Sequence, residues 1–323
     1  MSGLRIGSLC TGYGGLDMAV QAVIGGSLAW VADNDPGAAA ILAHHHPGVP
    51  NLGDITALDW RDVPPVDVLC GGYPCQPFSV AGKRRGTADE RHIWPFIATA
   101  LGVLRPQLAV FENVANHLRI GFDQVLRDLA RIGFDAEWCL VRASDVGAAH
   151  QRRRLIILAV AADAADLGHQ WGGPARAGGS GLAHHRGPAA DPPRDGRHEG
   201  SGHPHPGHGA PGEGGQGEPR GVGAEPTDWG PFAPAVRRWE HVTGRPAPGA
   251  TDALGRLSPI LVEWLMGLPE GHVTAVPGLS RAQQLKALGN GVVPRQAEAA
   301  IRVLTTRAGL VLDEPAPARR AAA

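Results

Sequence analysis

Short apolar runs alternate with stretches of helical spacing over the first half of the chain. The apolar runs predict buried strands at Ile6–Leu9, Leu28–Ala32, Val66–Gly71, Leu108–Phe111, Ala136–Val141 and Leu155–Val160. Apolar residues at helical spacing predict helices at Gly15–Ile24, Pro36–His46 and Gln124–Ile132. Because strands that alternate with helices build parallel sheets, this order predicts an α/β fold with a doubly wound, mostly parallel sheet.

The pattern stops between about residues 168 and 226. Of these 59 residues, 18 are Gly and 9 are Pro, so the segment has few apolar side chains to bury. Such a composition cannot offset its ordering entropy, and we expect a disordered or loosely ordered insert. Its histidines, which include His203, His205 and His208, could bind a metal, but a polar linker is the favoured interpretation.

Helical spacing returns after the insert. It predicts helices at Val236–Val242, Ser258–Met266, Arg281–Leu288 and Pro294–Leu304. Ser258 followed by Pro259 is typical of a helix start, because serine caps free amides and proline fits the first helical position. The tail from Asp313 is rich in Ala, Pro and Arg, and we expect it to fray.

Composition narrows the class of protein. The 323 residues are 43% apolar and carry a net charge of -1, so no global basic field indicates a nucleic-acid partner, although arginines cluster locally. Four cysteines show neither a disulfide framework nor a zinc-like pairing. We find no signal peptide and no run that could span a bilayer, so we expect a soluble protein of the reducing cytoplasm.

Cys75 stands between Pro74 and Pro77, directly after an apolar run. Each proline fixes its own φ and favours an extended neighbour, so the cysteine is held on a stiff loop. Open α/β sheets bind their ligands at the carboxyl ends of strands, where this loop is expected to lie. The pattern predicts a nucleophilic thiol, whereas a small buried residue in a tight turn is the simpler reading of a lone cysteine.

A glycine-rich loop joins the first predicted strand to the first helix. Gly12 and Gly14 fit a dinucleotide fingerprint, but its third glycine is replaced by Asp17. A nucleoside without a pyrophosphate, such as S-adenosylmethionine, fits better, because its carboxylate can use free amides and its ribose can use Asp33. Asp54 could accept from an adenine amino group. A glycine turn with no ligand is the alternative.

Two further groups lie at predicted strand ends. Glu112 closes one strand, where it would share the edge of the sheet with Cys75. Arg152 and Arg154 precede the last strand, and alternation would place both on one face. Taken singly, these residues are more typical of solvated or capping side chains.

Six motifs in order resemble the C5-cytosine DNA methyltransferase family. They are the loop Cys10–Leu16, Pro74-Cys75-Gln76, Glu112-Asn113-Val114, the arginine-rich segment His150–Arg154, the stretch Arg256–Pro269 and the stretch Leu288–Pro294. The resemblance covers nearly all the segments with predicted structure. It implies a Rossmann-like methyltransferase sheet with a smaller, irregular target-recognition domain.

The resemblance implies roles for the matching residues. Cys75 would add to C6 of cytosine, Glu112 would bind N3 and the exocyclic amine, and Arg152 and Arg154 would lie near the base. The S-adenosylmethionine site would be lined by Gly12, Tyr13, Gly15, Asp33, Asp54, Asn290 and Val292. Pro74 would shape both this site and the pocket for the target base. A soft thiolate at C6 makes C5 nucleophilic toward a sulfonium methyl, and the base must leave the duplex to be reached. No metal is expected.

The implied domain organisation is discontinuous. Residues 1–162 would form the catalytic domain, 163–279 the target-recognition region, 280–306 a segment returning to the catalytic domain, and 307–323 a tail. DNA would lie in the cleft between the two domains. The recognition interval is largely the Gly/Pro/His insert, so its ordered reader would come from Thr227–Leu254, with Trp229, Phe232, Arg237, Arg238 and Trp239 as candidates. Two further departures from the family are Cys10 in place of an aromatic residue and His150 in place of Gln.

The expected activity is therefore methyl transfer to C5 of a flipped-out cytosine in double-stranded DNA by a monomer. Restriction–modification with a cognate endonuclease, or protection of viral or host DNA, would be its setting. Two alternatives stay open: an RNA (tRNA) cytosine-5 methyltransferase on the same fold, and a catalytically weak DNA-binding relic.

Overall fold

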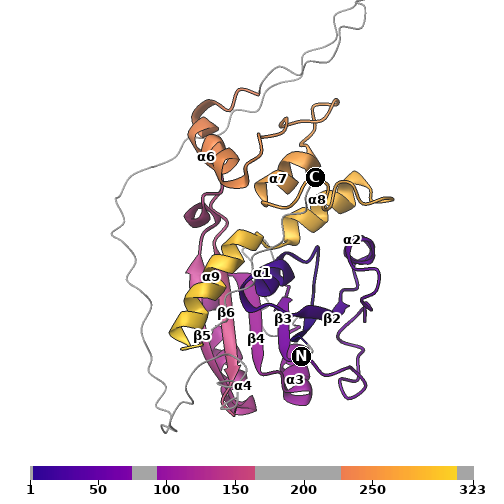
Figure 1. Cartoon of the computed structure of the whole chain (residues 1–323), viewed down its shortest axis with the longest axis vertical. Helices are drawn as coiled ribbons and strands as arrows, with labels where there is room; N and C mark the ends of the chain where they lie inside the picture. The colour runs from indigo at the N-terminus through magenta and orange to yellow at the C-terminus, as the bar shows by residue number, and fades with distance from the viewer. Residues whose placement is uncertain (1–2, 75–92, 164–226, 311–323) are drawn as a thin grey trace, which may run out of the picture. The chain divides into compact units, whose positions relative to one another are not determined.

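The computed structural model describes residues 3–74, 93–163 and 227–310 (Figure 1). Within these ranges six strands form one sheet in the order β2-β1-β3-β4-β6-β5. The strands are β1 (Arg5–Leu9), β2 (Ser27–Ala32), β3 (Val68–Gly72), β4 (Leu108–Val114), β5 (Phe134–Val141) and β6 (Arg154–Ala161). The first four are parallel along the sheet, while β6 runs antiparallel to both of its neighbours. The predicted α/β fold with a mostly parallel sheet is confirmed.

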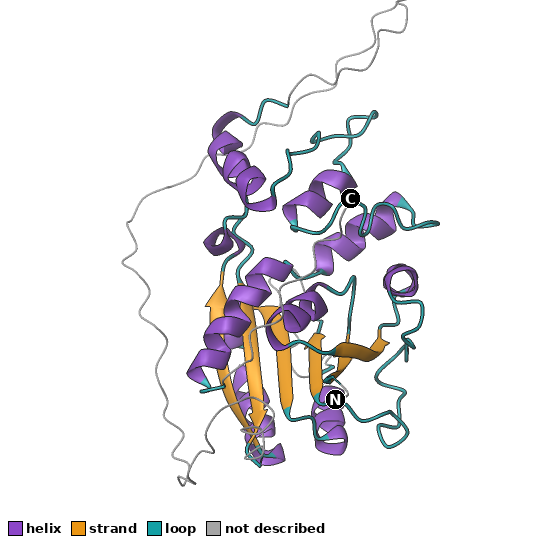
Figure 2. Ribbon diagram, in the orientation of Figure 1, coloured by secondary structure: helices purple, strands orange, loops and turns teal. Residues whose placement is uncertain are grey.

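Helices cover both faces of the sheet (Figure 2). Helices α1 (Gly15–Ile24) and α9 (Pro294–Arg307) pack together on one face, over the even-numbered side chains of β4 such as Leu108 and Val110. Helices α3 (Trp94–Leu104) and α4 (Phe122–Ile132) cover the other face, over Phe111. Strands buried on both faces read as continuous apolar runs, which is why the sequence reveals them so clearly.

Local signals set the helix starts. Asp35 accepts from the amides of Gly37 and Ala38 at the start of α2 (Pro36–His45), and Ser258 accepts from Leu261 at the start of α7 (Pro259–Leu265). A capping box of Ser280 and Gln283 opens α8 (Arg281–Asn290). These caps satisfy amides that have no partner inside the helix, so they fix where each helix begins.

Helix α3 has no counterpart among the predicted elements. Its sequence, WPFIATALGVL, is apolar along almost its whole length, so it lacks the polar stripe that marks a surface helix. Trp94 and Leu101 are fully buried against the sheet, and the indole of Trp94 donates to Asp128 of α4 at 3.0 Å. Pro95 near its start was the one signal available, since proline is favoured in a first helical turn.

The segment after residue 226 adds a third apolar cluster. Helix α6 (Ala233–Thr243), α7 and α8 surround Trp239 and Trp264, and this cluster also contains Tyr13 and Ile41 from the first part of the chain. Trp239 is fully buried, and its indole donates to the carbonyl of Trp264 at 2.9 Å. The division into a catalytic and a target-recognition domain stays a prediction.

Three predictions fall outside the described residues: the Cys75 loop, the insert at 168–226 with its histidines, and the tail from Asp313. Among the helices of the described ranges, none is long and apolar enough to cross a membrane.

Candidate active site

The strand ends bring Glu112 and Arg154 together. In the antiparallel pair β4–β6, Val114 lies opposite Arg154, and directly opposed residues point to the same side of a sheet. Glu112 lies two positions before Val114, so alternation places it on that side as well. Because β6 runs antiparallel, its first residue meets the carboxyl end of β4. The register therefore puts the two side chains side by side.

The two groups form a buried ion pair. Arg154 Nε lies 2.6 Å from Glu112 Oε1, and the side chains are 18% and 9% exposed. Burial raises the pKa of Glu112, while Arg154 and then Arg152 oppose the rise. The ion pair holds the Glu112 carboxyl in one position at this edge of the sheet.

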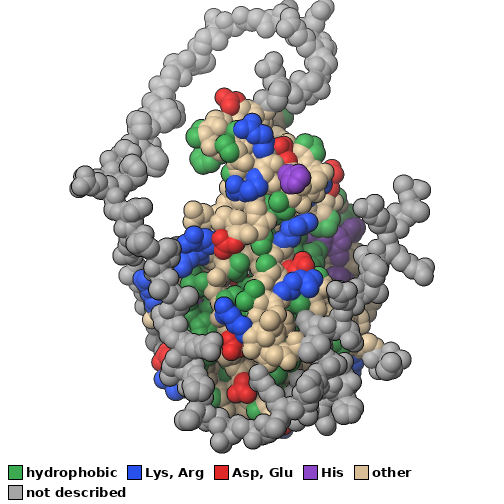
Figure 3. All heavy atoms as spheres, turned by 60° about the vertical axis from the view of Figure 1, so that its left-hand side comes forward, with side chains coloured by type: hydrophobic (Ala, Val, Ile, Leu, Met, Phe, Trp, Pro, Cys, Tyr) green, Lys and Arg blue, Asp and Glu red, His purple; other side chains and the backbone are tan. Residues whose placement is uncertain are grey.

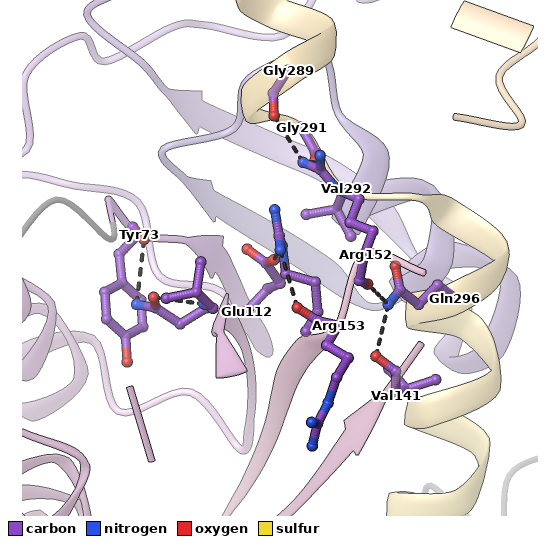
Figure 4. A network of polar contacts seen from close by, with 12 residues as sticks. Tyr73, Glu112, Val141, Arg152, Arg153, Gly289, Gly291, Val292 and Gln296 are labelled. Carbon is purple, nitrogen blue, oxygen red and sulfur yellow. Dashed lines mark hydrogen bonds and ion pairs between the residues drawn. The ribbon is translucent and has the colours of Figure 1, made fainter. Parts of the chain in front are cut away.

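Arg152 lies elsewhere than predicted. It precedes β6 in a turn with a left-handed φ of 27°, so the expectation that Arg152 and Arg154 share a strand face is wrong. Its guanidinium donates to the carbonyls of Gly289 at 2.9 Å and Gly291 at 2.5 Å (Figure 4). Gln296 of α9 in turn donates to the carbonyls of Arg152 at 2.7 Å and Val141 at 2.9 Å. Arg152 thus fastens the segment between α8 and α9 to the start of β6.

Gly72, the last residue of β3, lies between the ion pair and this C-terminal segment. In the β3–β4 register it is opposite Glu112. A Cβ at Gly72 would lie 3.3 Å from Glu112 Oε2 and 3.8 Å from Val292 Cγ2. Two residues later comes Pro74, which is exposed and is the last described residue before Cys75. The chain therefore enters the Cys75 loop beside Glu112.

The glycine loop lies beside Asp33 at the end of β2. Gly12 and Gly14 have φ of 59° and 84°, a left-handed geometry that suits glycine. The amide of Gly12 donates to Asp33 Oδ2 at 2.8 Å, and the amide of Asp35 donates to Oδ1 at 2.9 Å. Burial is the main cause that raises the pKa of Asp33. Sequence reasoning assigned this carboxylate to a ligand, and the structure shows that it also orders the loop.

Asp54 is fixed in a similar way. Its Oδ1 accepts from the amide and hydroxyl of Thr56 at 2.9 and 2.8 Å, and its Oδ2 accepts from Asn34 at 3.1 Å. Cys10 lies close to both acids: burial, then Asp33, then Asp54 raise the pKa of its thiol to about 12. A raised pKa disfavours the thiolate, so these surroundings do not activate Cys10 as a nucleophile.

Tyr13 contacts the protein rather than open space. It is 2% exposed, and its hydroxyl donates to the carbonyl of Val292 at 2.6 Å. A Cβ at Gly15 would lie 2.3 Å from that same carbonyl oxygen, so only glycine fits there. Val292 is buried and Asn290, the last residue of α8, is exposed. The structure thus places the predicted cofactor residues Gly12, Tyr13, Gly15 and Val292 around one loop.

Several supporting residues were not found from the sequence. Tyr73 is buried, and its hydroxyl is 2.7 Å from His117 Nε2. Asn113 donates to the carbonyl of Tyr73 at 3.4 Å, so the chain just before Pro74 is held from two sides. Asn34 is a third such residue. Each acts through a long-range contact that no local pattern indicates, although Asn113 belongs to the triplet already singled out.

Comparison with known proteins agrees with this geometry. The sequence profile of the C-5 cytosine-specific DNA methylase family matches residues 4–171, just over half of the chain. The chain belongs to this family. It is 33% identical over 168 residues to the Type II methyltransferase M.HgiBI of Herpetosiphon aurantiacus. It is 32% identical over 168 residues to the Type II methyltransferase M.NaeI of Lentzea aerocolonigenes.

These matches are partial. The first covers 50% of the methylase chain and 38% of its relative, and the second 50% and 40%. Solved structures extend the similarity of the fold. The S. pombe Dnmt2 methyltransferase has a TM-score of 0.57 at 16% identity, covering 95% of this chain and 100% of its own. A mutant of Spodoptera frugiperda DNMT2 has a TM-score of 0.56 at 16% identity, covering 93% and 99%.

Proposed function

We propose that the chain transfers a methyl group from S-adenosylmethionine to C5 of cytosine in DNA, with Cys75 as the nucleophile. The observation that carries this proposal is the buried Glu112–Arg154 pair beside Gly72, where β3 leads into Pro74 and Cys75. Family membership supplies the reaction class. The structure supplies a carboxyl and a guanidinium at the entrance to the cysteine loop.

Each residue type answers a need of the reaction. C5 of cytosine is a weak nucleophile, so the Cys75 thiolate first adds to C6 and pushes electron density to N3 and C5. A proton from Glu112 at N3 balances the charge that develops on the ring. Arg154 keeps the carboxyl oriented and provides positive charge near the thiol. After C5 is methylated it loses its proton, and the thiolate leaves from C6, which restores the aromatic ring.

The described residues fit S-adenosylmethionine, which would supply the electrophilic methyl. Helix α1 has no side-chain cap at Gly14, and the amides of Gly15 and Leu16 in its first turn would bind the carboxylate of the methionine moiety. Asp33 and Asp54 each accept two or three hydrogen bonds, yet a carboxylate offers about four lone-pair sites, which leaves capacity for ribose and adenine donors. Asn290 and Val292 would close the site.

DNA is the proposed substrate, because the family and the Type II relatives are DNA methylases. The surface alone does not indicate it: on the face in Figure 3, basic side chains lie among acidic ones. In the proposed reader, Trp239 is core, and Arg238 donates to the carbonyls of Gly147 at 3.1 Å and Ala148 at 3.3 Å. Phe232 is 67% exposed, Arg237 and Arg238 are also exposed, and Trp229 is half-buried. A cognate endonuclease would complete a restriction–modification pair.

Methyl transfer from labelled S-adenosylmethionine tests the proposal. We expect label in duplex DNA with the wild type and none above background with Cys75→Ala. Total tRNA serves as the competing substrate. Label in tRNA but not in DNA would replace the DNA proposal with its RNA alternative. Loss of cofactor binding in a folded Cys75→Ala protein would contradict the role given to the thiol.

A further inference from the structure

The side chain of Tyr13 joins the glycine loop to a segment 279 residues away. Its hydroxyl donates to the carbonyl of Val292 at 2.6 Å, and the ring is buried. Burial raises the pKa of the phenol, so the hydroxyl remains a donor at neutral pH. Tyr13 as a whole is 2% exposed, so its ring and hydroxyl are enclosed by the protein.

Two glycines are shaped around this ring. A Cβ at Gly291 would lie 1.8 Å from Tyr13 Cε1, and one at Gly15 would lie 2.6 Å from Cε2. Real side-chain atoms do not approach so closely, so the ring fills the space between the two backbones. The segment Gly291–Val292 therefore rests directly on the aromatic ring of the glycine loop.

The backbone of Tyr13 is held as well. His272 Nε2 lies 2.8 Å from the carbonyl oxygen of Tyr13, and the two rings meet edge to face at 6.1 Å. His45 stacks on His272 at 4.0 Å, and its Nε2 lies 2.7 Å from the carbonyl oxygen of His272. Since a carbonyl only accepts, both Nε2 atoms carry hydrogen, a tautomer assigned from the hydrogen bonds.

The segment that carries His272 is itself anchored. Glu263 of α7 is 1% exposed, and its carboxylate accepts from the amides of Gly271 and Val273 at 2.7 Å and Thr274 at 2.8 Å. A buried carboxylate that is satisfied by three amides fixes the loop around it. His272 thus presents its Nε2 to Tyr13 from a rigid support.

We propose that Tyr13 is a positioning residue of the cofactor site. Its phenol and ring fasten Gly291–Val292 across the glycine loop, and His272 fixes the direction of its carbonyl. The site is then assembled before S-adenosylmethionine binds, which lowers the entropic cost of binding. This inference rests on the proposed function, because that function supplies the ligand.

Tyr13→Phe tests it, because the ring stays and only the hydrogen bond is lost. We expect S-adenosylmethionine to bind about fivefold to tenfold more weakly by calorimetry, the usual effect of removing one buried hydrogen bond. At saturating cofactor kcat should hardly change, so the loss falls on KM. Without cofactor, hydrogen exchange of the amides at 288–293 should accelerate.

Thr305→Val is the matched control, since Thr305 is also buried and its hydroxyl donates to the carbonyl of Arg302 at 3.0 Å near the end of α9, away from the site. It should lower Tm comparably yet leave cofactor affinity unchanged. Equal cofactor affinity in Tyr13→Phe and wild type, or equal weakening in both variants, would overturn the positioning role. If the wild type binds no S-adenosylmethionine, the proposed function is overturned instead. The hydrogen-exchange rates of the amides at 288–293 would then still test whether Tyr13 holds this segment in place.

His272 offers a second test should Tyr13→Phe fold poorly. His272→Leu removes the donor to the Tyr13 carbonyl, while His272→Gln places an amide donor near the Nε2 position. We expect weaker cofactor binding in the first variant and partial recovery in the second, with the exposed His44→Leu as control. If His272→Leu binds the cofactor as tightly as wild type and His272→Gln restores nothing, the proposed positioning is contradicted.

Discussion

Arg154 and Glu112 meet at 2.6 Å although they lie on strands that run in opposite directions. The contact depends on β6 being antiparallel, because only then does the first residue of β6 reach the carboxyl end of β4. The same edge holds Gly72 and the start of the Cys75 loop. One reversal in an otherwise parallel arrangement thus brings the carboxyl and the guanidinium to the proposed reaction centre.

Glu112→Gln should remove most of the activity without removing the cofactor. The amide cannot give a proton to N3, so we expect kcat to fall about 100-fold or more, the scale of general acid catalysis. Transfer of labelled methyl to DNA measures this, with calorimetry for cofactor affinity. Activity within tenfold of wild type would count against the role of Glu112.

Arg154→Met should destabilise the fold. It leaves the Glu112 carboxylate buried without its partner, a change that costs about 3–5 kcal/mol of unfolding free energy. The double variant Glu112→Gln with Arg154→Met should recover part of that loss, because no charge is left behind. Urea denaturation of the four proteins measures the coupling, and additive losses would show that the pair is energetically independent.

Gly291→Ala should disrupt the cofactor site. The new methyl would lie 1.8 Å from the Tyr13 ring, so either the ring or the segment must move. We expect at least about tenfold weaker S-adenosylmethionine binding, since two or more buried contacts are affected. Gly289→Ala is a close control, because a Cβ there has nothing within 4 Å. Similar binding by both variants would argue against the contact.

Acid should destabilise the protein partly through His272. Burial, with His45 and His46, lowers its pKa, while the Tyr13 carbonyl and Glu263 act in the opposite direction. A histidine whose pKa is lower in the folded protein binds fewer protons in the folded state than in the unfolded state. Its contribution to the unfolding free energy is therefore lost as pH falls below about 6.5, the pKa of an unfolded histidine. Between pH 7.5 and 5.5, wild type should therefore lose more unfolding free energy than His272→Gln. The reverse order in urea titrations would exclude this group as the source.

Parts of this structure with a local cause could be predicted from the sequence. The range Gly15–Ile24 was predicted and observed as α1, because its apolar spacing is helical and glycines precede it. Helix α3 was missed because its exposed face is also largely apolar, with Phe96 and Val103 open to solvent, so no polar stripe marks it. Arg152 was misplaced because a left-handed φ interrupts the strand just before Arg154, and no residue type there signals it.

The residues of the candidate site also differ in whether a local sequence pattern indicates them. Motif residues such as Glu112 and Asp33 were found because the sequence placed each near the carboxyl end of a predicted strand, where α/β sheets bind their ligands. Supporting residues such as His272 and Gln296 were not, since they contact Tyr13 and Arg152 from more than 130 residues away along the chain. Periodicity carries no information about such contacts, which depend on how α9 and the loop after α7 pack.

Bisulfite sequencing of DNA from cells that express the chain, beside cells that express Cys75→Ala, tests the proposed function most directly. We expect protected cytosines at one recurrent sequence with the wild type and none with the variant. DNA that is equally unprotected in both, from cells in which the folded protein is present, would mean that the chain does not methylate cytosine in DNA.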